Sequence, residues 1–283
     1  MITNLEITPM EKKGRGRPKK EVINYIPPVI DFGGMDRLKN LDIDPRMLGS
    51  MKSNMVFDEL ISFEGGVPFA TNIMAGGGPG VGKTTILLDL IASIQNSDRA
   101  LKVLFVSAEM GKKQMFKYTQ RFPQFGNIQT LFTSDYLSYN TKDVIEQVLN
   151  QGYDLVLIDS IAEVVEGVRD DNKWDRKTAE SWLVETLVNN NVGKNKTNKF
   201  TSFLLIQQFT KSKNDFVGSN RLKHLIDASC KFIREDEITS MCFDKNRNGE
   251  VGLKVDYNLM NDKIIYGSIS KHIEKDEEED NDE

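Results

Sequence analysis

The stretch from Ala75 to Leu90, AGGGPGVGKTTILLDL, combines a glycine-rich loop with one lysine and two threonines. Gly77, four intervening residues and then Gly82-Lys83-Thr84 fit the G-x-x-x-x-G-K-[ST] pattern of a phosphate-binding loop. Glycines let the chain curl so that successive backbone N–H groups point inward and form a hollow for an anion. The residues expected to contact phosphate are therefore Gly77, Gly78, Pro79, Gly80, Val81, Gly82, Lys83, Thr84 and Thr85.

The sequence around this loop supplies the context that the pattern needs. A strand-like run, residues 71–75, precedes it, and an apolar helix, residues 85–94, follows it. The helix adds the positive end of its dipole to the anion site. Lys83 is expected to reach the β- and γ-phosphates and the Thr84 hydroxyl to bind Mg²⁺, which predicts ATP and Mg²⁺ as cofactors. The alternative is a glycine-rich turn without a ligand.

Three further polar residues stand at the ends of apolar runs. The run LVLID ends in Asp159, which is expected to be the second protein partner of Mg²⁺. The run VLFVSAE ends in Glu109, a candidate base for the water that attacks the γ-phosphorus. The run FLLIQQ ends in Gln208, whose amide is expected to bond the γ-phosphate and report hydrolysis to the following loop. Capping or purely structural roles are the alternatives for all three.

These side chains can meet only if the runs that carry them are neighbouring strands. The runs alternate with helical patterns, including one from about Lys177 to Val188, and ASCKFIRE and MCFDK suggest later strands. Apolar strands separated by helices predict an α/β fold with a mostly parallel central sheet flanked by helices. In such a sheet ligands gather at the carboxyl ends of the strands, where the three polar residues stand.

Composition limits the class of protein further. With 283 residues, 39% of them hydrophobic, the chain suits one α/β domain of roughly 200–250 residues plus tails. Its two cysteines, Cys230 and Cys242, form no CxxC pair, which argues against a zinc site and fits a reducing compartment. No apolar run reaches the ~18 residues that a membrane helix needs, so we expect a cytoplasmic protein without a membrane partner.

The two ends of the chain differ in charge from its middle. Residues 1–20 carry six basic and two acidic residues, whereas residues 274–283 carry eight acidic residues and one lysine. We expect a basic arm containing proline and glycine over residues 1–50, a core over 51–270 and a disordered acidic tail over 271–283. The tail could dock basic protein partners, mimic DNA or only keep the chain in solution.

The arm contains Arg15-Gly16-Arg17-Pro18, flanked by lysines. This RGRP sequence matches the centre of an AT-hook, an extended element that inserts arginines into a narrow A·T minor groove. On that interpretation Arg15 and Arg17 bind A·T-rich duplex DNA. A solvated tail or a non-specific phosphate binder is the alternative.

The phosphate loop and the polar strand ends together resemble the core of RecA-like ATPases. Residues 217–236 are similar to the segment after the sensor strand in bacterial RadA/Sms proteins. DKNRNGEVG is close both to the K-N-R-F-G motif of RadA and to the K-x-R-N-G-x-x-G motif of DnaB-type replicative helicases. The resemblance implies that Lys245 and Arg247 project into a neighbouring subunit's ATP site and stabilise charge on the γ-phosphate. A basic turn beside Asn-Gly is the alternative.

This resemblance covers roughly residues 54–270 and implies a homo-oligomer, either a hexameric ring or a filament. The zinc module and protease-like domain of RadA, and the N-terminal helical domain of DnaB helicases, are not recognisable in the sequence. We therefore expect an isolated motor core with its own tails. Such economy suits a phage-encoded protein, in the cytoplasm of its host.

The resemblance also points to two segments that face DNA. The loop FTKSKNDFVGSN corresponds to one that touches single-stranded DNA in RecA-like proteins. Lys211 and Lys213 are expected to meet phosphates, and Phe209 and Phe216 to stack on bases; an ordinary mobile loop is the alternative. The mixed-charge segment 165–177 corresponds to the second loop.

The sequence thus predicts a DNA-dependent ATPase that acts on single-stranded DNA in recombination, repair or replication and hydrolyses ATP at subunit interfaces. A replicative-type helicase motor is one alternative. A KaiC-like regulatory ATPase with protein partners and no DNA is a second, and a small-molecule phosphotransferase is a third. The paired basic residues Lys245 and Arg247 favour the oligomeric interpretations, because a monomeric kinase has no use for them.

Overall fold

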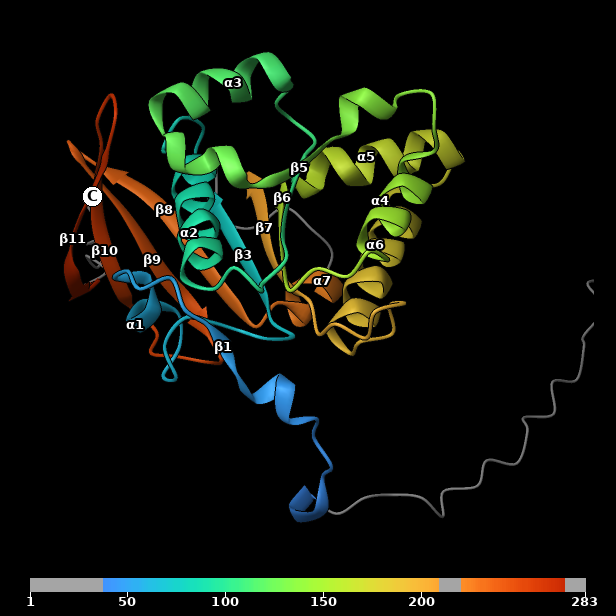
Figure 1. The fold of residues 1–283 in the computed structure, drawn as a ribbon, viewed down its shortest axis with the longest axis horizontal. Helices are drawn as coiled ribbons and strands as arrows, with labels where there is room; N and C mark the ends of the chain where they lie inside the picture. The colour runs from blue at the N-terminus through green and yellow to red at the C-terminus, as the bar shows by residue number, and fades with distance from the viewer. Residues whose placement is uncertain (1–37, 209–219, 273–283) are drawn as a thin grey trace, which may run out of the picture. The chain divides into compact units, whose positions relative to one another are not determined.

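In the computed structural model, which describes residues 38–208 and 220–272, a nine-stranded sheet runs through the centre of the chain (Figure 1). The chain divides into two units, residues 1–42 and residues 43–283. The described part of the first unit holds one short 3-10 turn, η1 (Leu38–Asn40). The sheet and the α-helices of the described residues belong to the second unit.

The sheet is parallel over most of its width. Its order is β11-β10-β9-β8-β3-β7-β6-β4-β5. Neighbours pair in parallel from β8 to β5, whereas β9, β10 and β11 continue from β8 as antiparallel strands. The strands are β3 (Asn72–Gly77), β4 (Val103–Ser107), β5 (Gln129–Phe132), β6 (Leu155–Asp159), β7 (Ser202–Gln208), β8 (Ala228–Glu235), β9 (Ile238–Asn246), β10 (Leu253–Leu259) and β11 (Ile264–Lys271). A separate ribbon pairs β1 (Ser50–Met51) with β2 (Val67–Pro68).

Most of the helices connect the parallel strands, whereas the first lies between β1 and β2. The helices are α1 (Phe57–Ile61), α2 (Lys83–Ser97), α3 (Lys112–Arg121), α4 (Thr141–Leu149), α5 (Ile161–Asn172), α6 (Arg176–Asn191) and α7 (Asn220–Leu225). Short 3-10 turns, η2 (Pro45–Leu48), η3 (Pro123–Asn127) and η4 (Thr133–Tyr136), complete the described elements. The phosphate loop lies between β3 and α2, at the carboxyl end of a central strand.

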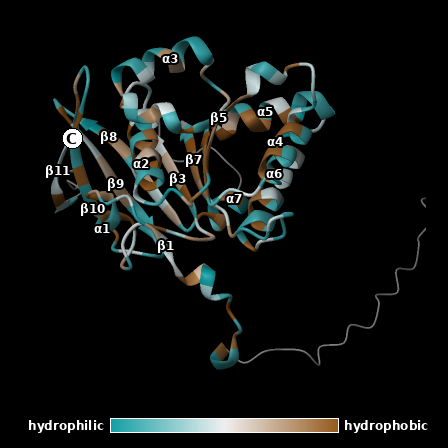
Figure 2. Cartoon of the chain, viewed as in Figure 1, coloured by the Kyte–Doolittle hydropathy of each residue, from teal (hydrophilic) through white to brown (hydrophobic). Residues whose placement is uncertain are grey.

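The helices cover the sheet on both faces. Successive strand residues point to opposite faces. Leu155 and Leu157 of β6 belong to the hydrophobic core that includes residues of α1, α2 and η3, whereas Val156 and Ile158 belong to the core that includes residues of α4, α5 and α6. The hydrophobic colour in Figure 2 is accordingly concentrated on the central strands. A sheet buried on both faces explains why its strands are continuous apolar runs rather than alternating ones.

The α/β fold class predicted from the sequence is confirmed. The runs VLFVS, LVLID and FLLIQQ form β4, β6 and β7, and ASCKFIRE forms β8. The helix expected from about Lys177 to Val188 begins one residue earlier, at Arg176, and continues to Asn191. Strands β5, β10 and β11 had no counterpart in the prediction, because their residues are only partly buried and carry weaker apolar runs.

Residues 165–177, interpreted from the sequence as a loop, are largely helical. Helix α5 extends to Asn172, and its residues Ile161, Val164 and Val168 are buried. Their spacing is that of one face of a helix. The charged residues of α5 lie on its other faces, where Arg169 pairs with Glu166 at 2.5 Å, and this alternation of charge obscured the helical period in the sequence.

The expected arm and tail fall mostly outside the described residues, which begin at 38 and end at 272. The boundaries predicted at residues 50 and 270 therefore stay predictions. Among the described residues, no helix is both long enough and apolar enough to cross a membrane.

Candidate phosphate-binding site

The glycine-rich loop is shaped by close contacts where it begins and where it ends. A Cβ added to Gly77 would lie 2.5 Å from the carbonyl oxygen of Phe232 on β8, so the loop starts in direct contact with the neighbouring backbone. Gly82 has a φ of 98° and immediately precedes the first residue of α2. Residues with a Cβ rarely adopt that backbone conformation, so the turn into the helix requires glycine.

The side chain of Lys83 folds back over this loop. Its Nζ donates to the carbonyl oxygens of Gly77, at 2.9 Å, and Gly78, at 2.8 Å. The residue is 9% exposed. Burial lowers the pKa of Lys83, and the carboxylates of Asp159 and Glu109 act against that shift. The ammonium group is thus held at the N-terminus of α2, where an anion is favoured.

Thr84 and Asp159 come from different elements and touch each other. Thr84 Oγ1, in the first turn of α2, donates to Asp159 Oδ2, at the end of β6, over 2.5 Å. Asp159 is 3% exposed. Burial raises its pKa to about 6, the Thr84 hydrogen bond lowers it, Glu109 raises it and Lys83 lowers it. The carboxyl is therefore harder to ionise than an aspartate in water.

This oxygen pair fits the Mg²⁺ site predicted from the sequence. Mg²⁺ takes hard oxygen ligands and usually binds one or two protein groups together with phosphate oxygens and waters. Thr84 and Asp159 supply a hydroxyl and a carboxylate side by side. Residues 38–208 and 220–272 contain no group of three or more His, Cys, Asp or Glu side chains that could hold a metal ion.

Two more of the predicted residues lie at the same edge of the sheet. The backbone N–H of Glu109 donates to the carbonyl oxygen of Asp159 at 3.2 Å. The Glu109 side chain is exposed and lies close enough to Lys83 and Asp159 to shift their pKa values. Gln208 pairs with Gly77 across β7 and β3, although the placement of its side chain is outside the described part of the chain.

Lys245 and Arg247, at and just beyond the end of β9, are anchored close to α7. Lys245 Nζ donates to the carbonyl oxygens of Lys223, at 3.1 Å, and Ile226. Arg247 Nη1 pairs with Asp227 Oδ1 at 3.3 Å, and 55% of the arginine side chain is exposed. Burial lowers the pKa of Lys245, and the charge of Arg247 lowers it further. Both cations are held in place, but Arg247 stays open to solvent.

This pair lies at the opposite edge of the sheet from the phosphate loop. The N–H of Arg247 donates to the carbonyl of Asp227, and the N–H of Asp227 donates to the carbonyl of Asn72, the first residue of β3. Gly77, where the loop begins, is the last residue of the same strand. At ~3.3 Å per residue, β3 separates Arg247 from the loop of its own chain by about 16 Å.

The residues predicted to contact DNA cannot be placed. Arg15, Arg17, Phe209, Lys211, Lys213 and Phe216 all lie outside the described residues. The description resumes at Asn220, the first residue of α7.

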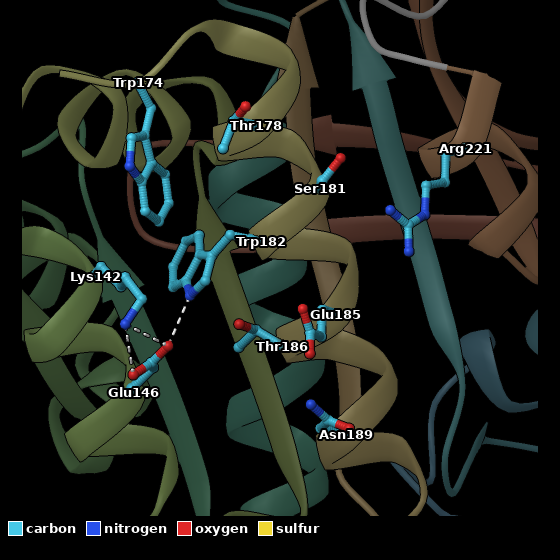
Figure 3. A pocket seen from close by; sticks show the side chains of 10 residues that line it. All are labelled: Lys142, Glu146, Trp174, Thr178, Ser181, Trp182, Glu185, Thr186, Asn189 and Arg221. Atoms are coloured by element: carbon cyan, nitrogen blue, oxygen red, sulfur yellow. Dashed lines mark hydrogen bonds and ion pairs between the residues drawn. The ribbon is translucent and has the colours of Figure 1, made fainter. Parts of the chain in front are cut away.

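A cavity of about 470 Å³ lies beside α7 (Figure 3). Trp174, in the connection after α5, and Trp182, on α6, line it together with Arg221 of α7. Trp182 Nε1 donates to Glu146 Oε1 at 2.7 Å, and the same oxygen pairs with Lys142 at 3.2 Å, so the indole is fixed. These are the only two tryptophans of the sequence.

The fold is that of RecA-like P-loop proteins, as the sequence predicted, and the residues gathered at the loop have the arrangement expected for such a core. The KaiC-like protein PH0186 from Pyrococcus horikoshii OT3 has this architecture, with a TM-score of 0.57 and 17% identity over 78% of this chain and 99% of that one. The flagellar accessory protein FlaH from Methanocaldococcus jannaschii gives a TM-score of 0.54 and 12% identity over 77% and 99%. At these identities the likeness shows the fold alone.

The chain also has relatives that are similar in sequence. The chain is 27% identical over 214 residues to the DNA repair protein RadA of Rickettsia prowazekii, which covers 74% of this chain and 45% of the relative. It is 29% identical over 199 residues to the RadA of Streptococcus pyogenes serotype M1, covering 67% and 40%. The chain thus spans less than half the length of these relatives, and no family model matches it.

Two contacts of the site escaped the sequence analysis. Asp227 lay within the segment that resembles RadA, but no spacing in the sequence indicates that its carboxylate holds Arg247. The hydroxyl of Tyr257 donates to the carbonyl of Val81, inside the loop, at 2.6 Å across a separation of 176 residues. No local pattern joins residues so far apart, and only the pairing of strands brings them together.

Proposed function

We propose that this chain hydrolyses ATP at a site that a second copy of the chain completes. The observation that carries the proposal is the meeting of Lys83, Thr84 and Asp159 where β3, α2 and β6 converge. A lysine in a glycine-rich loop, a hydroxyl after it and an aspartate at a strand end are the parts with which P-loop ATPases hold phosphate and Mg²⁺. A turn without a ligand gives no reason to bury these charged groups together.

The residues of this chain would divide the chemistry as follows. The N–H groups of the loop and Lys83 would bind the β- and γ-phosphates. Mg²⁺ held by Thr84 and Asp159 would neutralise charge on the phosphates. Glu109 would accept a proton from the water whose oxygen attacks the γ-phosphorus, while the bond to the bridging oxygen breaks to release ADP and phosphate. Gln208 would contact the γ-phosphate from β7.

Lys245 and Arg247 would act on the ATP of a neighbouring copy. Their position supports this, because β3 separates them from the loop of their own chain while Arg247 remains exposed. A cation supplied by a second subunit stabilises the charge that spreads over the γ-phosphate oxygens during transfer. The proposal therefore requires a homo-oligomer, a ring or a filament, with ATP at the interfaces.

We also propose that single-stranded DNA stimulates this activity, in recombination, repair or replication. Relatives of this chain are named as DNA repair proteins. The segment between β7 and α7 carries the basic and aromatic residues expected to contact strands, and the Trp174–Arg221 cavity lies beside the start of α7. Aromatic side chains next to cations are the usual means of binding single strands without sequence preference.

A regulatory ATPase with protein partners is the second candidate, supported by the likeness to a KaiC-like protein. A helicase motor is a third, and it shares the site and the oligomer with the proposed function. The regulatory candidate predicts ATP turnover that DNA does not change. The helicase predicts strand separation in addition to DNA-stimulated turnover.

The deciding experiment measures ATP turnover with and without single-stranded oligonucleotides, at low and moderate salt. We expect single strands to raise turnover several-fold, with a smaller effect at the higher salt because phosphate contacts release counterions. Both tryptophans line the cavity beside α7, so their emission offers an independent, label-free report of strand binding. Turnover by the wild-type chain that is identical with and without DNA would favour the regulatory candidate.

Matched variants separate the two predicted DNA contacts. Lys211→Ala combined with Lys213→Ala should blunt stimulation by single strands while leaving duplex binding by the arm. Deletion of residues 1–22 should do the reverse, lowering affinity for duplex and its salt dependence together. If Arg15 and Arg17 enter a minor groove, that loss should be larger on A·T-rich than on G·C-rich duplex.

A further inference from the structure

The phosphate loop is bonded to β10, a strand near the far end of the described chain. The Tyr257 hydroxyl donates to the Val81 carbonyl at 2.6 Å. Tyr257 is 6% exposed, and burial raises the pKa of its phenol, so the hydroxyl keeps its proton as a donor. The loop that follows β3 therefore receives a hydrogen bond from β10, a strand that is not adjacent to β3 in the sheet.

The position of this bond determines the direction of one peptide unit. In a trans peptide the C=O and the following N–H point in opposite directions. Because Tyr257 holds the Val81 carbonyl on its own side, the N–H of Gly82 points away from Tyr257. Gly82 directly precedes α2, where the N–H groups that face an anion are found. The hydrogen bond to Val81 thus orients the N–H of Gly82 as a donor to the anion hollow.

Two further side chains support the loop from the same side of the sheet. The position of a Gly82 Cβ lies 2.6 Å from Leu259 Cδ1, on the same strand as Tyr257. The backbone of Phe232 lies against Gly77, and the Phe232 ring meets the Tyr257 ring edge-on at 6.1 Å. Phe232, Tyr257 and Leu259 therefore form a support, here called the β8–β10 support, that contacts the loop at Gly77, where it begins, and at Val81 and Gly82, where it ends.

We propose that Tyr257 is a positioning residue that holds the phosphate loop in its anion-binding conformation before nucleotide arrives. The inference rests on the proposed ATP site. A loop that has lost this bond would sample other orientations of the Val81–Gly82 peptide. Affinity for phosphate would then fall in proportion to the fraction of loops that remain competent. Chemistry after binding would be little affected, because bound phosphates restore the orientation.

A second tyrosine provides a matched control. The Tyr266 hydroxyl, on β11, donates to Asp89 Oδ2 of α2 at 2.7 Å. Like Tyr257, it bonds one hydroxyl from the antiparallel strands to the segment around α2, but its partner lies beyond the loop. Tyr257→Phe and Tyr266→Phe each remove one hydroxyl and its hydrogen bond. A general loss of stability would appear in both variants, whereas loss of loop positioning would appear only in Tyr257→Phe.

The experiment measures dissociation constants for ATP and for inorganic tripolyphosphate, with Mg²⁺, on the full chain. We expect Tyr257→Phe to raise both constants by the same factor, roughly two- to tenfold, because one neutral hydrogen bond is lost. The KM for ATP should rise by that factor while kcat changes by less than about twofold. Tyr266→Phe should bind both ligands as the wild type does. Amide hydrogen exchange in residues 77–85 should be faster in Tyr257→Phe alone.

Two results would overturn this inference while leaving the ATPase intact. One is wild-type affinity of Tyr257→Phe for both ligands. The other is faster exchange spread evenly over the whole chain, which would mark Tyr257 as general support of the fold. A wild-type chain that binds neither ATP nor tripolyphosphate would overturn the proposed function as well as the positioning role.

Discussion

The two edges of the central sheet carry charged residues in opposite ways. At the carboxyl edge, Lys83 and Asp159 are buried and in contact with their own loop and helix. At the amino edge, the Arg247 side chain is 55% exposed and is held by Asp227 and a carbonyl of α7. Lys83 and Asp159 are thus withdrawn from solvent at one edge, whereas Arg247 faces solvent at the other.

This difference indicates how the proposed ATPase site would be divided between two copies of the chain. Burial at the carboxyl edge fixes the groups that we propose to hold phosphate and Mg²⁺, and it shifts their pKa values at a cost in desolvation. Exposure at the amino edge leaves Arg247 available for a charge that its own chain does not provide. If the proposal is correct, the first edge sets affinity and the second sets turnover only after assembly.

The largest effect is expected when the carboxyl edge is broken. Lys83→Ala removes the ammonium group from the loop and should lower ATP turnover by at least about 10³-fold, because the developing phosphate charge loses a buried donor. A phosphate-release assay with purified chain measures this. Lys112→Ala, at the exposed start of α3, is a control that should keep wild-type turnover. Normal turnover by Lys83→Ala would refute the assignment of the site.

Breaking the amino edge should cost less binding but nearly as much turnover. Arg247→Ala should keep ATP affinity while losing about 10³-fold in turnover, the size of effect that a trans-acting arginine has in related chemistry. Mixing it with Lys83→Ala chains should restore activity at composite sites, since each chain supplies what the other lacks. Absence of rescue at every ratio, in an oligomer shown to exchange subunits, would contradict action in trans.

A variant of Glu109, the exposed acid at the carboxyl edge, tests whether this residue is the base in ATP hydrolysis. Glu109→Gln keeps the size of the side chain and one acceptor oxygen but cannot serve as a base. Turnover should fall about 10²- to 10³-fold, while ATP affinity, measured by equilibrium binding, should stay within about twofold. Glu166→Gln, on α5 away from the loop, serves as the matched control. Equal turnover in Glu109→Gln and wild type would remove Glu109 from the mechanism.

The buried aspartate makes stability depend on pH. Asp159 has a pKa of about 6 in the folded chain against 3.8 in the unfolded one, so the folded state binds more protons between these values. The resulting stability is present below pH ~4 and is lost as pH rises through 6, by about 3 kcal/mol.

Asp159→Asn cannot ionise and should escape that loss. Urea unfolding should therefore show the Asn variant gaining stability relative to wild type between pH 4.5 and pH 7.5, in the absence of nucleotide and Mg²⁺. The same difference in free energy of unfolding at both pH values would contradict a raised pKa for this carboxyl.

The smallest effect is expected from a change to Asp227, at the amino edge. Asp227 accepts the N–H of Asn72 at 3.0 Å as well as the Arg247 guanidinium. Asp227→Asn keeps an oxygen for the backbone but weakens the charged partner, so turnover should fall only two- to fivefold, as expected for an exposed ion pair. Steady-state kinetics on the assembled protein measure this. A loss as large as that of Arg247→Ala would mean that Asp227 has a role of its own.

Local sequence patterns indicate which residues lie together at the carboxyl edge, but they do not do so for the amino edge. A phosphate loop is local, because the hollow, the lysine and the hydroxyl all follow one strand within a few residues. Asp159 and Glu109 stand at the ends of apolar runs, which indicate buried parallel strands. Lys245 and Arg247 came from a family resemblance, since nothing in a basic turn states which edge it occupies. The support by Tyr257 came only from the pairing of β8, β9 and β10.

The contact between Tyr257 and Val81 also affects when the site can form during synthesis. Residues 77–85 leave the ribosome long before β10 exists, since 176 residues separate the two partners. Nascent chains that end before residue 253 would contain the entire glycine motif and still lack the Tyr257 hydroxyl that binds it. Ribosome-stalled chains of increasing length should therefore acquire ATP-dependent resistance to protease only once β10 has emerged, so the motif met first along the sequence would be among the last to work.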